Sequence, residues 1–353
     1  MAKVLMKGNE AVAEAAISAG CTCFFGYPIT PQNQIPEYMS KRMPEVGGTF
    51  VQAESEVAAI NMVYGAAGAG ARVMTSSSSP GISLKQEGIS YIACAELPCV
   101  IVNMVRSGPG LGGILPSQGD YFQAVKGGGH GDYKLITLAP CSVQEAVDMV
   151  MLGFDLADQY RNPVMILGDG MIGQMMEPAE FSAYEKRDLP PKTWAATGWD
   201  GKSRPRAIIN SLYIEPEEMT AVVDRLQKKY AEIAKNETRV EEYMTEDAEY
   251  IIAAFGTTAR IAKSTAQMAR KQGLKVGVIR PITLWPFPTA AFEKTATRVS
   301  GILTVEMNCG QMVEDVRLAV AGKVPVDFYG TTGGFVPEQK DILAKIYAMK
   351  EGK

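Results

Sequence analysis

Residues 71–106, ARVMTSSSSPGISLKQEGISYIACAELPCVIVNMVR, alternate between two kinds of pattern. An apolar run enters a hydroxyl-rich turn at 75–81, a helical pattern follows over 81–95, and a second strongly apolar run ends at Arg106. Short apolar runs bounded by turn residues are typical of buried strands, whereas the spacing between the two runs is typical of a helix. The stretch therefore predicts a strand–helix–strand unit whose two strands run parallel in one sheet.

The same alternation extends over residues 9–169, and a second one covers residues 250–330. Strands that alternate with helices predict a parallel sheet covered on both faces. Between the two lies a stretch rich in Pro, Gly and charge over 187–208, followed by a charged helical pattern with an apolar stripe over 215–243. We therefore predict an α/β protein with two doubly wound parallel-sheet domains, residues 1–186 and 246–353, joined by a linker arm with a charged helix over 187–245.

The composition excludes several classes of protein. The chain has 353 residues and a formal net charge of −4, with no block of basic residues, so we expect no nucleic-acid partner. No apolar run approaches the roughly 18 residues that a membrane span needs, and the first residues do not resemble a signal peptide. We expect a cytoplasmic protein without a membrane partner.

The sequence does not predict a metal site in this chain. No two cysteines have the C-x-x-C spacing of zinc or iron–sulfur sites, and His130 is the single histidine. The chain has six cysteines, and the short gaps at Cys21/Cys23 and Cys94/Cys99 are weak metal signals that buried reduced thiols explain better.

Three further motifs point only weakly to ligands. The runs GPGLGG and GAAGAGA do not have the G-x-G-x-x-G spacing, between a strand and a helix, of a dinucleotide loop. The run GDG at 168–170 resembles the start of a magnesium–diphosphate motif, but no asparagine pair follows at the required distance, so we expect no magnesium at Asp169. His130, in GGGHGD, is either a ligand-facing side chain or a loop histidine satisfied by local backbone.

Three unusual loops follow predicted strands, at 26–31, 75–81 and 106–113. Ligands of open parallel sheets bind beyond the carboxyl ends of the strands. Thr30 lies between two prolines, which restrict its backbone, and Arg106 ends a very apolar strand. A guanidinium and a rigid hydroxyl together bind a small carboxylate well, although Thr30 could instead cap the turn and Arg106 could pair with a surface acid.

Glu54 and Glu56 open a small-residue helical pattern, SEVAAINMVYGAAGAG. The helix dipole favours negative charge there, which is a purely structural explanation. The residues that follow Glu56 in this pattern are almost all apolar or small, so its carboxyl could also be buried. A buried carboxyl has a raised proton affinity and can share a proton with a heterocycle nitrogen.

Six segments together resemble the α subunit of the 2-oxoacid:ferredoxin oxidoreductases, of the branched-chain (2-oxoisovalerate) or the 2-oxoglutarate type. In chain order they are GYPITP, SEVAAINMVYGAAGAGARVMTSSSSPG, VNMVRSGPG, QGDYFQAVKGGGHGD, RPITLWPFP and VEMNCGQ.

The resemblance implies a role for each candidate residue. It makes the first domain the pyrimidine-binding domain of a thiamine diphosphate site, and the second similar to a transketolase C-terminal domain. Glu56 takes the place of the glutamate that activates the cofactor through its pyrimidine ring. Thr30 and Arg106 take the places of the residues that bind the carboxylate of the 2-oxoacid.

The resemblance also implies partners. It places Mg²⁺ and the [4Fe–4S] clusters in partner subunits: a β subunit with the diphosphate–Mg motif, and a γ or ferredoxin-like δ subunit. The reaction is then oxidative decarboxylation of a 2-oxoacid, favouring 3-methyl-2-oxobutanoate, to acyl-CoA and CO₂ with reduction of ferredoxin. A 2-oxoglutarate enzyme, a non-oxidative thiamine-dependent decarboxylase subunit and a non-catalytic scaffold remain as alternatives.

Overall fold

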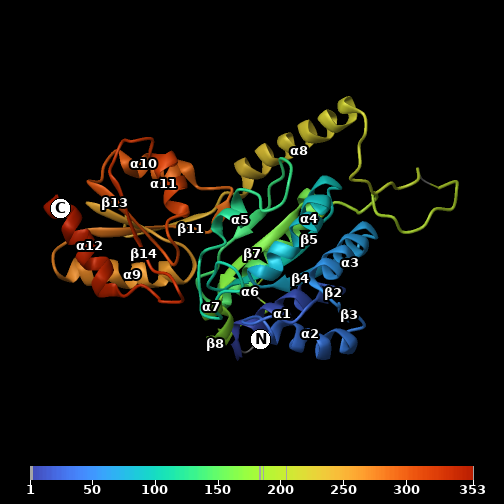
Figure 1. Ribbon diagram of the computed structural model, residues 1–353, viewed down its shortest axis with the longest axis horizontal. Helices are drawn as coiled ribbons and strands as arrows, with labels where there is room; N and C mark the ends of the chain where they lie inside the picture. The colour runs from blue at the N-terminus through green and yellow to red at the C-terminus, as the bar shows by residue number, and fades with distance from the viewer. Residues whose placement is uncertain (1–2, 183, 186, 204, 353) are drawn as a thin grey trace.

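The computed structural model describes residues 3–182, 184–185, 187–203 and 205–352. The chain forms two lobes, each built around one sheet, with a long segment projecting from the first lobe (Figure 1). The predicted boundary at residue 186 lies outside the described residues, and the three domain ranges remain predictions.

The first lobe contains a seven-stranded sheet in the order β12-β6-β7-β5-β4-β2-β3. All neighbours are parallel except β12, which is antiparallel to β6. The strands are β2 (Cys23–Gly26), β3 (Thr49–Gln52), β4 (Val73–Ser77), β5 (Cys99–Val105), β6 (Ile136–Leu138), β7 (Pro163–Asp169) and β12 (Thr283–Trp285). The predicted parallel sheet of the first lobe is confirmed.

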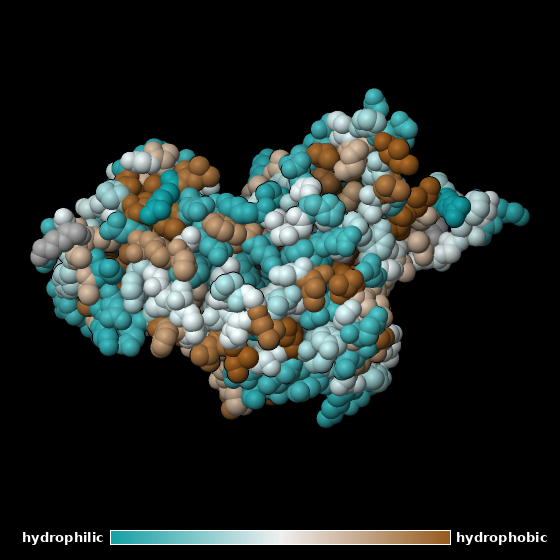
Figure 2. All heavy atoms as spheres, viewed as in Figure 1, coloured by the Kyte–Doolittle hydropathy of each residue, from teal (hydrophilic) through white to brown (hydrophobic). Residues whose placement is uncertain are grey.

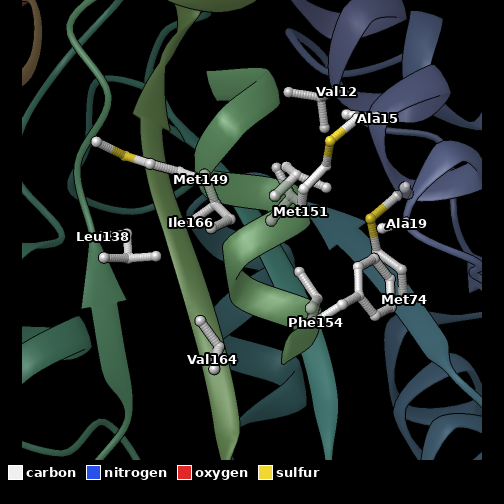
Figure 3. Packing of buried hydrophobic residues seen from close by; sticks show 14 of the residues in the cluster. Val12, Ala15, Ala19, Met74, Leu138, Met149, Met151, Phe154, Val164 and Ile166 are labelled. Carbon is white, nitrogen blue, oxygen red and sulfur yellow. The ribbon is translucent and has the colours of Figure 1, made fainter. Parts of the chain in front are cut away.

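Helices cover both faces of this sheet. Their bounds are α1 (Gly8–Ser18), α2 (Gln34–Glu45), α3 (Glu56–Gly68), α4 (Pro80–Cys94), α5 (Tyr121–Val125), α6 (Val143–Tyr160) and α7 (Gly170–Gln174). Because side chains alternate along a strand, Val100 and Val102 of β5 pack with α1, α2 and α6, whereas Ile101 packs with α3, α4 and α5. Figure 3 shows the first of these cores, where Met151 of α6 meets Val12 and Ala15 of α1.

The second lobe contains a five-stranded sheet in the order β14-β13-β10-β11-β9, parallel except for β9. The strands are β9 (Val240–Tyr243), β10 (Tyr250–Ala253), β11 (Val276–Pro281), β13 (Gly301–Glu306) and β14 (Val326–Gly330). Helices α9 (Gly256–Lys271) and α12 (Gln339–Glu351) pack on one face, and α10 (Thr289–Ala296) and α11 (Met312–Val320) on the other.

The two lobes share structure in a way that the sequence analysis did not predict. Strand β12 comes from the later part of the chain but joins the first sheet, and one hydrophobic cluster contains both Ile101 of β5 and Ile279 of β11. Gln118 binds across the lobes through its side chain, which donates to the Phe255 carbonyl (2.8 Å) and accepts from the Met307 amide (3.0 Å). The lobes are therefore held together by a common core.

The linker arm differs from the predicted one at its end. Its helix is α8 (Pro216–Glu237), but residues 240–243, which were assigned to the helix, form strand β9 of the second sheet. The described residues of 187–215 contain no helix or strand. In the space-filling view this segment is largely hydrophilic towards its tip, with hydrophobic atoms near its base (Figure 2). Strand β12, the C-terminal helix α12 and the antiparallel pair of β1 (Val4–Lys7) and β8 (Met176–Ala179) were not predicted from the sequence.

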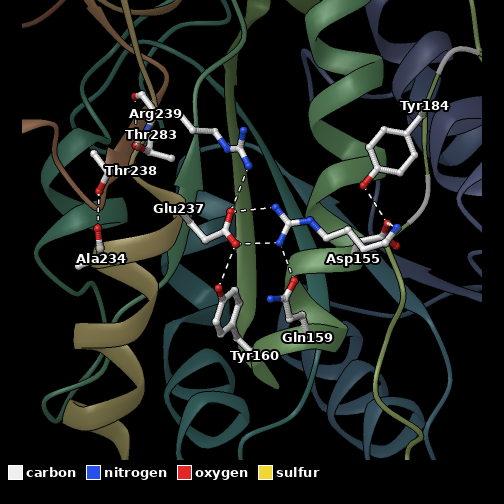
Figure 4. A network of polar contacts seen from close by, with 10 residues as sticks. Asp155, Gln159, Tyr160, Tyr184, Ala234, Glu237, Thr238, Arg239 and Thr283 are labelled. Carbon is white, nitrogen blue, oxygen red and sulfur yellow. Dashed lines mark hydrogen bonds and ion pairs between the residues drawn. The ribbon is translucent and has the colours of Figure 1, made fainter.

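Glu237 fastens the end of the arm to the first lobe. Its buried carboxylate accepts hydrogen bonds from both terminal nitrogens of Arg187 (2.7 and 2.9 Å), from Tyr160 (2.9 Å) and from Arg239 (3.1 Å) (Figure 4). The end of the segment is thus bound to the first lobe by a charged cluster.

None of the helices in the described ranges has the length and apolar character needed to cross a bilayer.

Candidate functional site

The three loops singled out in the sequence meet at one edge of the first sheet. Strands β2, β4 and β5 are parallel neighbours, so their carboxyl ends, at Gly26, Ser77 and Val105, lie on the same side. Ser76 at the end of β4 donates a hydrogen bond to the side chain of Gln32 (2.5 Å), which joins the first two loops.

Glu56 is the first residue of α3 and is buried, with 6% of its surface exposed. Ser55 caps the helix by accepting a hydrogen bond from the Ala58 amide (3.2 Å), which leaves the Glu56 carboxylate at the positive end of the helix dipole. Gly81, in the first turn of α4, faces this carboxylate: a Cβ placed on Gly81 would lie 2.6 Å from Glu56 Oε1 and closer still to Ser77 Oγ. Glycine at position 81 is therefore what leaves room for the two side chains.

The turn between β4 and α4 carries unsatisfied polar atoms. The hydroxyls of Ser77 and Ser78 are buried and have no hydrogen-bond partner among the described residues. Ser79 has a strained backbone (φ 24°), and its amide donates to the side chain of Asn103 (3.2 Å). Buried polar groups are nearly always paired, so these two free hydroxyls, of which that of Ser77 lies beside the buried Glu56 carboxylate, indicate a ligand site.

Arg106 follows β5 and is connected to this turn. Its amide donates to Ser79 Oγ (3.1 Å), and its guanidinium donates to the carbonyls of Thr30 (2.9 Å) and Leu111 (2.8 Å). The guanidinium Nε is buried without a partner among the described residues. The Thr30 hydroxyl accepts a hydrogen bond from Asn33 Nδ2 (3.3 Å), and Arg106 contacts Thr30 at its backbone carbonyl.

These contacts link the three predicted site residues through residues 79–81 at the start of α4. Glu56 faces Gly81, and Arg106 binds Ser79 and Thr30. A carboxylate, two free hydroxyls and a guanidinium therefore line one edge of the sheet. This set can exchange a proton with a nitrogen heterocycle at one end and hold a carboxylate at the other.

A groove of about 620 Å³ opens beside Thr30. Its walls are mostly apolar and include Ile114, Leu115, Met171 and Met175. None of the described residues that line it is a lysine or an arginine. The groove thus suits an apolar group better than a second carboxylate.

Lys85 was missed in the sequence analysis. It lies one turn after Gly81 on α4, is fully buried, and donates to Thr75 Oγ1 (2.6 Å) and to the Ser76 carbonyl (3.1 Å). The helical spacing could have revealed it, because Lys85 falls between Ile82 and Ile89 on the buried face of α4.

The weaker candidates have local structural partners. Asp169 caps α7 by accepting from the amides of Met171 (2.9 Å) and Ile172 (3.1 Å), and burial raises the pKa of its carboxyl. His130 is exposed, its ring lies edge-on to Tyr91, and its carbonyl accepts from Ser90. In the described part of the chain no cluster of three His, Cys, Asp or Glu side chains could hold a metal ion.

Comparisons with known proteins identify the family to which the chain belongs. Residues 14–247 match the family model "Pyruvate flavodoxin/ferredoxin oxidoreductase, thiamine diP-bdg", and residues 248–342 match "Pyruvate:ferredoxin oxidoreductase core domain II". The chain belongs to this family, the 2-oxoacid:ferredoxin oxidoreductases, whose first domain binds thiamine diphosphate.

Individual relatives indicate which members of the family the chain resembles. The chain is 51% identical to the ketoisovalerate oxidoreductase subunit VorB of Methanothermobacter marburgensis, over 98% of this chain and 97% of the relative. It is 37% identical to the 2-oxoglutarate synthase subunit KorA of Methanothermobacter thermautotrophicus, over 98% of both chains. The 2-oxoglutarate:ferredoxin oxidoreductase of Magnetococcus marinus, solved with 2-oxoglutarate, coenzyme A and succinyl-CoA, superposes with a TM-score of 0.89 at 26% identity; this chain spans 65% of its length.

Proposed function

We propose that the chain is the subunit of a branched-chain 2-oxoacid:ferredoxin oxidoreductase that holds the pyrimidine end of thiamine diphosphate. The enzyme class follows from the family. The substrate, the residue roles and the partner subunits are our proposal. It is supported by the VorB relative and by the groove beside Thr30, whose described lining residues are mostly apolar and include no lysine or arginine.

The residues present fit the cofactor's pyrimidine ring. The observation that carries this is the buried Glu56 carboxylate, which faces the space kept open by Gly81 next to the unpartnered hydroxyl of Ser77. Glu56 would hold the ring through a nitrogen, and it would take up and return a proton at Oε1 or Oε2. When bound, thiamine diphosphate supplies the carbanion chemistry that lets a 2-oxoacid lose carbon dioxide.

The chain's other residues orient the substrate. The Arg106 guanidinium, already held by two carbonyls, would direct its remaining donors to the carboxylate of the 2-oxoacid, with the Thr30 hydroxyl beside it. Because Arg106 is only 6% exposed, water competes weakly for these donors. The apolar side chain of 3-methyl-2-oxobutanoate would lie in the groove lined by Ile114 and Met171.

Other parts of the enzyme would come from partners. We propose a β subunit that binds the diphosphate through Mg²⁺ and carries an [4Fe–4S] cluster, and a γ or ferredoxin-like δ subunit, with ferredoxin and coenzyme A as co-substrates. On this proposal the isolated chain has no activity. Robust reduction of a redox dye by the isolated chain in the presence of a 2-oxoacid would refute it.

The test is Glu56→Gln in the reconstituted complex, with Glu54→Gln as the matched control because Glu54 is exposed and two residues away. General acid–base catalysis contributes roughly 10²- to 10⁴-fold, so Glu56→Gln should lose at least about 100-fold in turnover, whereas Glu54→Gln should keep its activity. A scaffold subunit would keep full turnover in both variants. Release of aldehyde without ferredoxin reduction by the wild-type complex would favour a non-oxidative decarboxylase.

A further inference from the structure

Lys85 has an unusual environment for a charged residue. Its side chain has no exposed surface, and its amine donates only to two uncharged oxygens, Thr75 Oγ1 and the Ser76 carbonyl. Moving an ammonium group from water to such a place is costly unless another charge compensates. A methionine of similar length would fill the same space without this cost, so packing alone does not explain a lysine here.

The Glu56 carboxylate lies in the same region as this amine. Gly81 and Lys85 are four residues apart and therefore lie on the same face of α4, and Gly81 is the residue that faces the Glu56 carboxylate. Ser76, whose carbonyl binds the amine, adjoins Ser77, whose hydroxyl lies against Gly81. The amine and the carboxylate thus border the same few residues at the start of α4.

The titration of Lys85 is consistent with this arrangement. Burial lowers the pKa of its amine to about 7, and the negative charge of Glu56 opposes that change. The other group that acts on it, the Cys99 thiol of β5, stays neutral near pH 7 because burial raises its pKa to about 12. Other titratable or charged groups of the described residues near α4 are Tyr64 of α3, Tyr121 of α5, Asp169 of β7, and Arg106, Asp120, His130, Asp132 and Tyr133 in the loops.

We propose that Lys85 is a positioning residue that places a positive charge behind the Glu56 carboxylate and keeps this carboxylate ionised in its buried site. A carboxylate that must accept a proton from a bound heterocycle has to be unprotonated when the ligand arrives. Burial works against that condition, and a nearby ammonium restores it. The relevance to catalysis rests on the proposed function, but the coupling between the two side chains does not.

The coupling can be measured in the full-length chain without any cofactor. The probe is the ¹³Cδ chemical shift of Glu56 in protein labelled at glutamate carboxyls, assigned by its loss in Glu56→Gln. We expect two inflections as the pH is raised: the titration of Glu56 itself and a second one near pH 7, where Lys85 loses its charge. Exposed Glu54 should show no second inflection. If the wild-type protein shows no second inflection at Glu56, the proposal is overturned without any variant.

Two variants provide the direct comparison. In Lys85→Met the midpoint of the Glu56 titration should rise by about one to two pH units, because a neighbouring positive charge is lost. Lys85→Gln also removes the charge but keeps a donor for Ser76, so it should give the same shift if Lys85→Met folds poorly. Thr75→Val removes a partner of the amine and leaves the charge, so it should leave the midpoint within a few tenths. Equal midpoints in all four proteins would show that Lys85 has a structural role only.

The enzyme assay separates this inference from the proposed function. In the reconstituted complex, the acid limb of the pH profile of kcat/KM should move upward in Lys85→Met together with the Glu56 midpoint. If Glu56→Gln retained full activity, the proposed function would fail while the coupling seen by NMR could still stand. If Glu56→Gln were inactive and the NMR coupling absent, only the role of Lys85 would fail.

Discussion

Replacing Gly81 with alanine tests the position of Glu56 without substituting any charged residue. The new Cβ would lie 2.6 Å from Glu56 Oε1 and 3.1 Å from its Cγ, and would also collide with Ser77 Oγ. Both side chains end in freely rotating groups, so they can turn away from the methyl group. We therefore expect Gly81→Ala to fold and to displace the Glu56 carboxylate.

The expected loss of turnover follows from the hydrogen bond that a displaced Glu56 carboxylate would no longer make to the cofactor's pyrimidine ring. A hydrogen bond to a charged group contributes about 1.5–3 kcal/mol, which corresponds to about 10- to 150-fold in turnover. Stability should change little, because alanine is favoured over glycine in a helix by up to about 1 kcal/mol and turning two side chains costs about as much. Turnover of the reconstituted complex and the Tm of the chain are the two measurements.

Gly88 on the same helix is the matched control. Its Cβ would lie 2.5 Å from Ile60 Cγ2 and 2.8 Å from Cγ1, in the contact between α3 and α4, and Ile60 is only 1% exposed. A buried branched side chain cannot turn away, so Gly88→Ala should cost about 1–3 kcal/mol of stability. Folded Gly88→Ala should keep its turnover. If Gly81→Ala were fully active, or if both variants lost turnover and stability alike, the position assigned to Glu56 would be wrong.

Three further predictions concern other charged residues. Arg106→Ala should raise KM for the 2-oxoacid by about ten- to several-hundredfold, the equivalent of about 1.5–3 kcal/mol for a charge-assisted contact, and an unchanged KM would remove Arg106 from the site. Because burial lowers the pKa of Lys85 to about 7, the wild-type folded state binds fewer protons than the unfolded state above that pH, so its stability should rise from about pH 7 towards pH 10. The stability of Lys85→Met relative to the wild type in urea unfolding should therefore fall as the pH rises above about 7, and a constant difference would contradict a buried, titrating amine. Glu237→Gln should lower Tm by about 3–6 °C because it leaves Arg187 and Arg239 with a neutral partner in a buried cluster, and an unchanged Tm would show that the cluster contributes no stability.

Local patterns in the sequence were sufficient for the strand–helix alternation, but they left open whether Glu56 is buried. The parallel sheets were predictable because a buried strand is a short apolar run and its helix carries an apolar stripe. Strand β12 was not predictable, since Thr283–Trp285 pairs with β6 about 145 residues earlier, and nothing in three residues specifies a partner at that distance. The charged run 240–243 was assigned to a helix because its pairing with β11, which makes it a strand, is also non-local.

The candidate site also has some features that the sequence predicted and others that only the tertiary structure decided. Residue types and turn chemistry made Glu56, Thr30 and Arg106 candidates, because prolines and a charge at the end of an apolar strand are local signals, and the family resemblance supplied the role predicted for each. Tertiary structure decided how they meet: Arg106 binds the carbonyl of Thr30, Gly81 makes the space in front of Glu56, and the amine of Lys85 is enclosed beneath the turn. The physical reason is that a sequence specifies which groups are costly to bury, whereas the partners that offset this cost come from segments brought together only by the packing of α3 and α4 on the sheet.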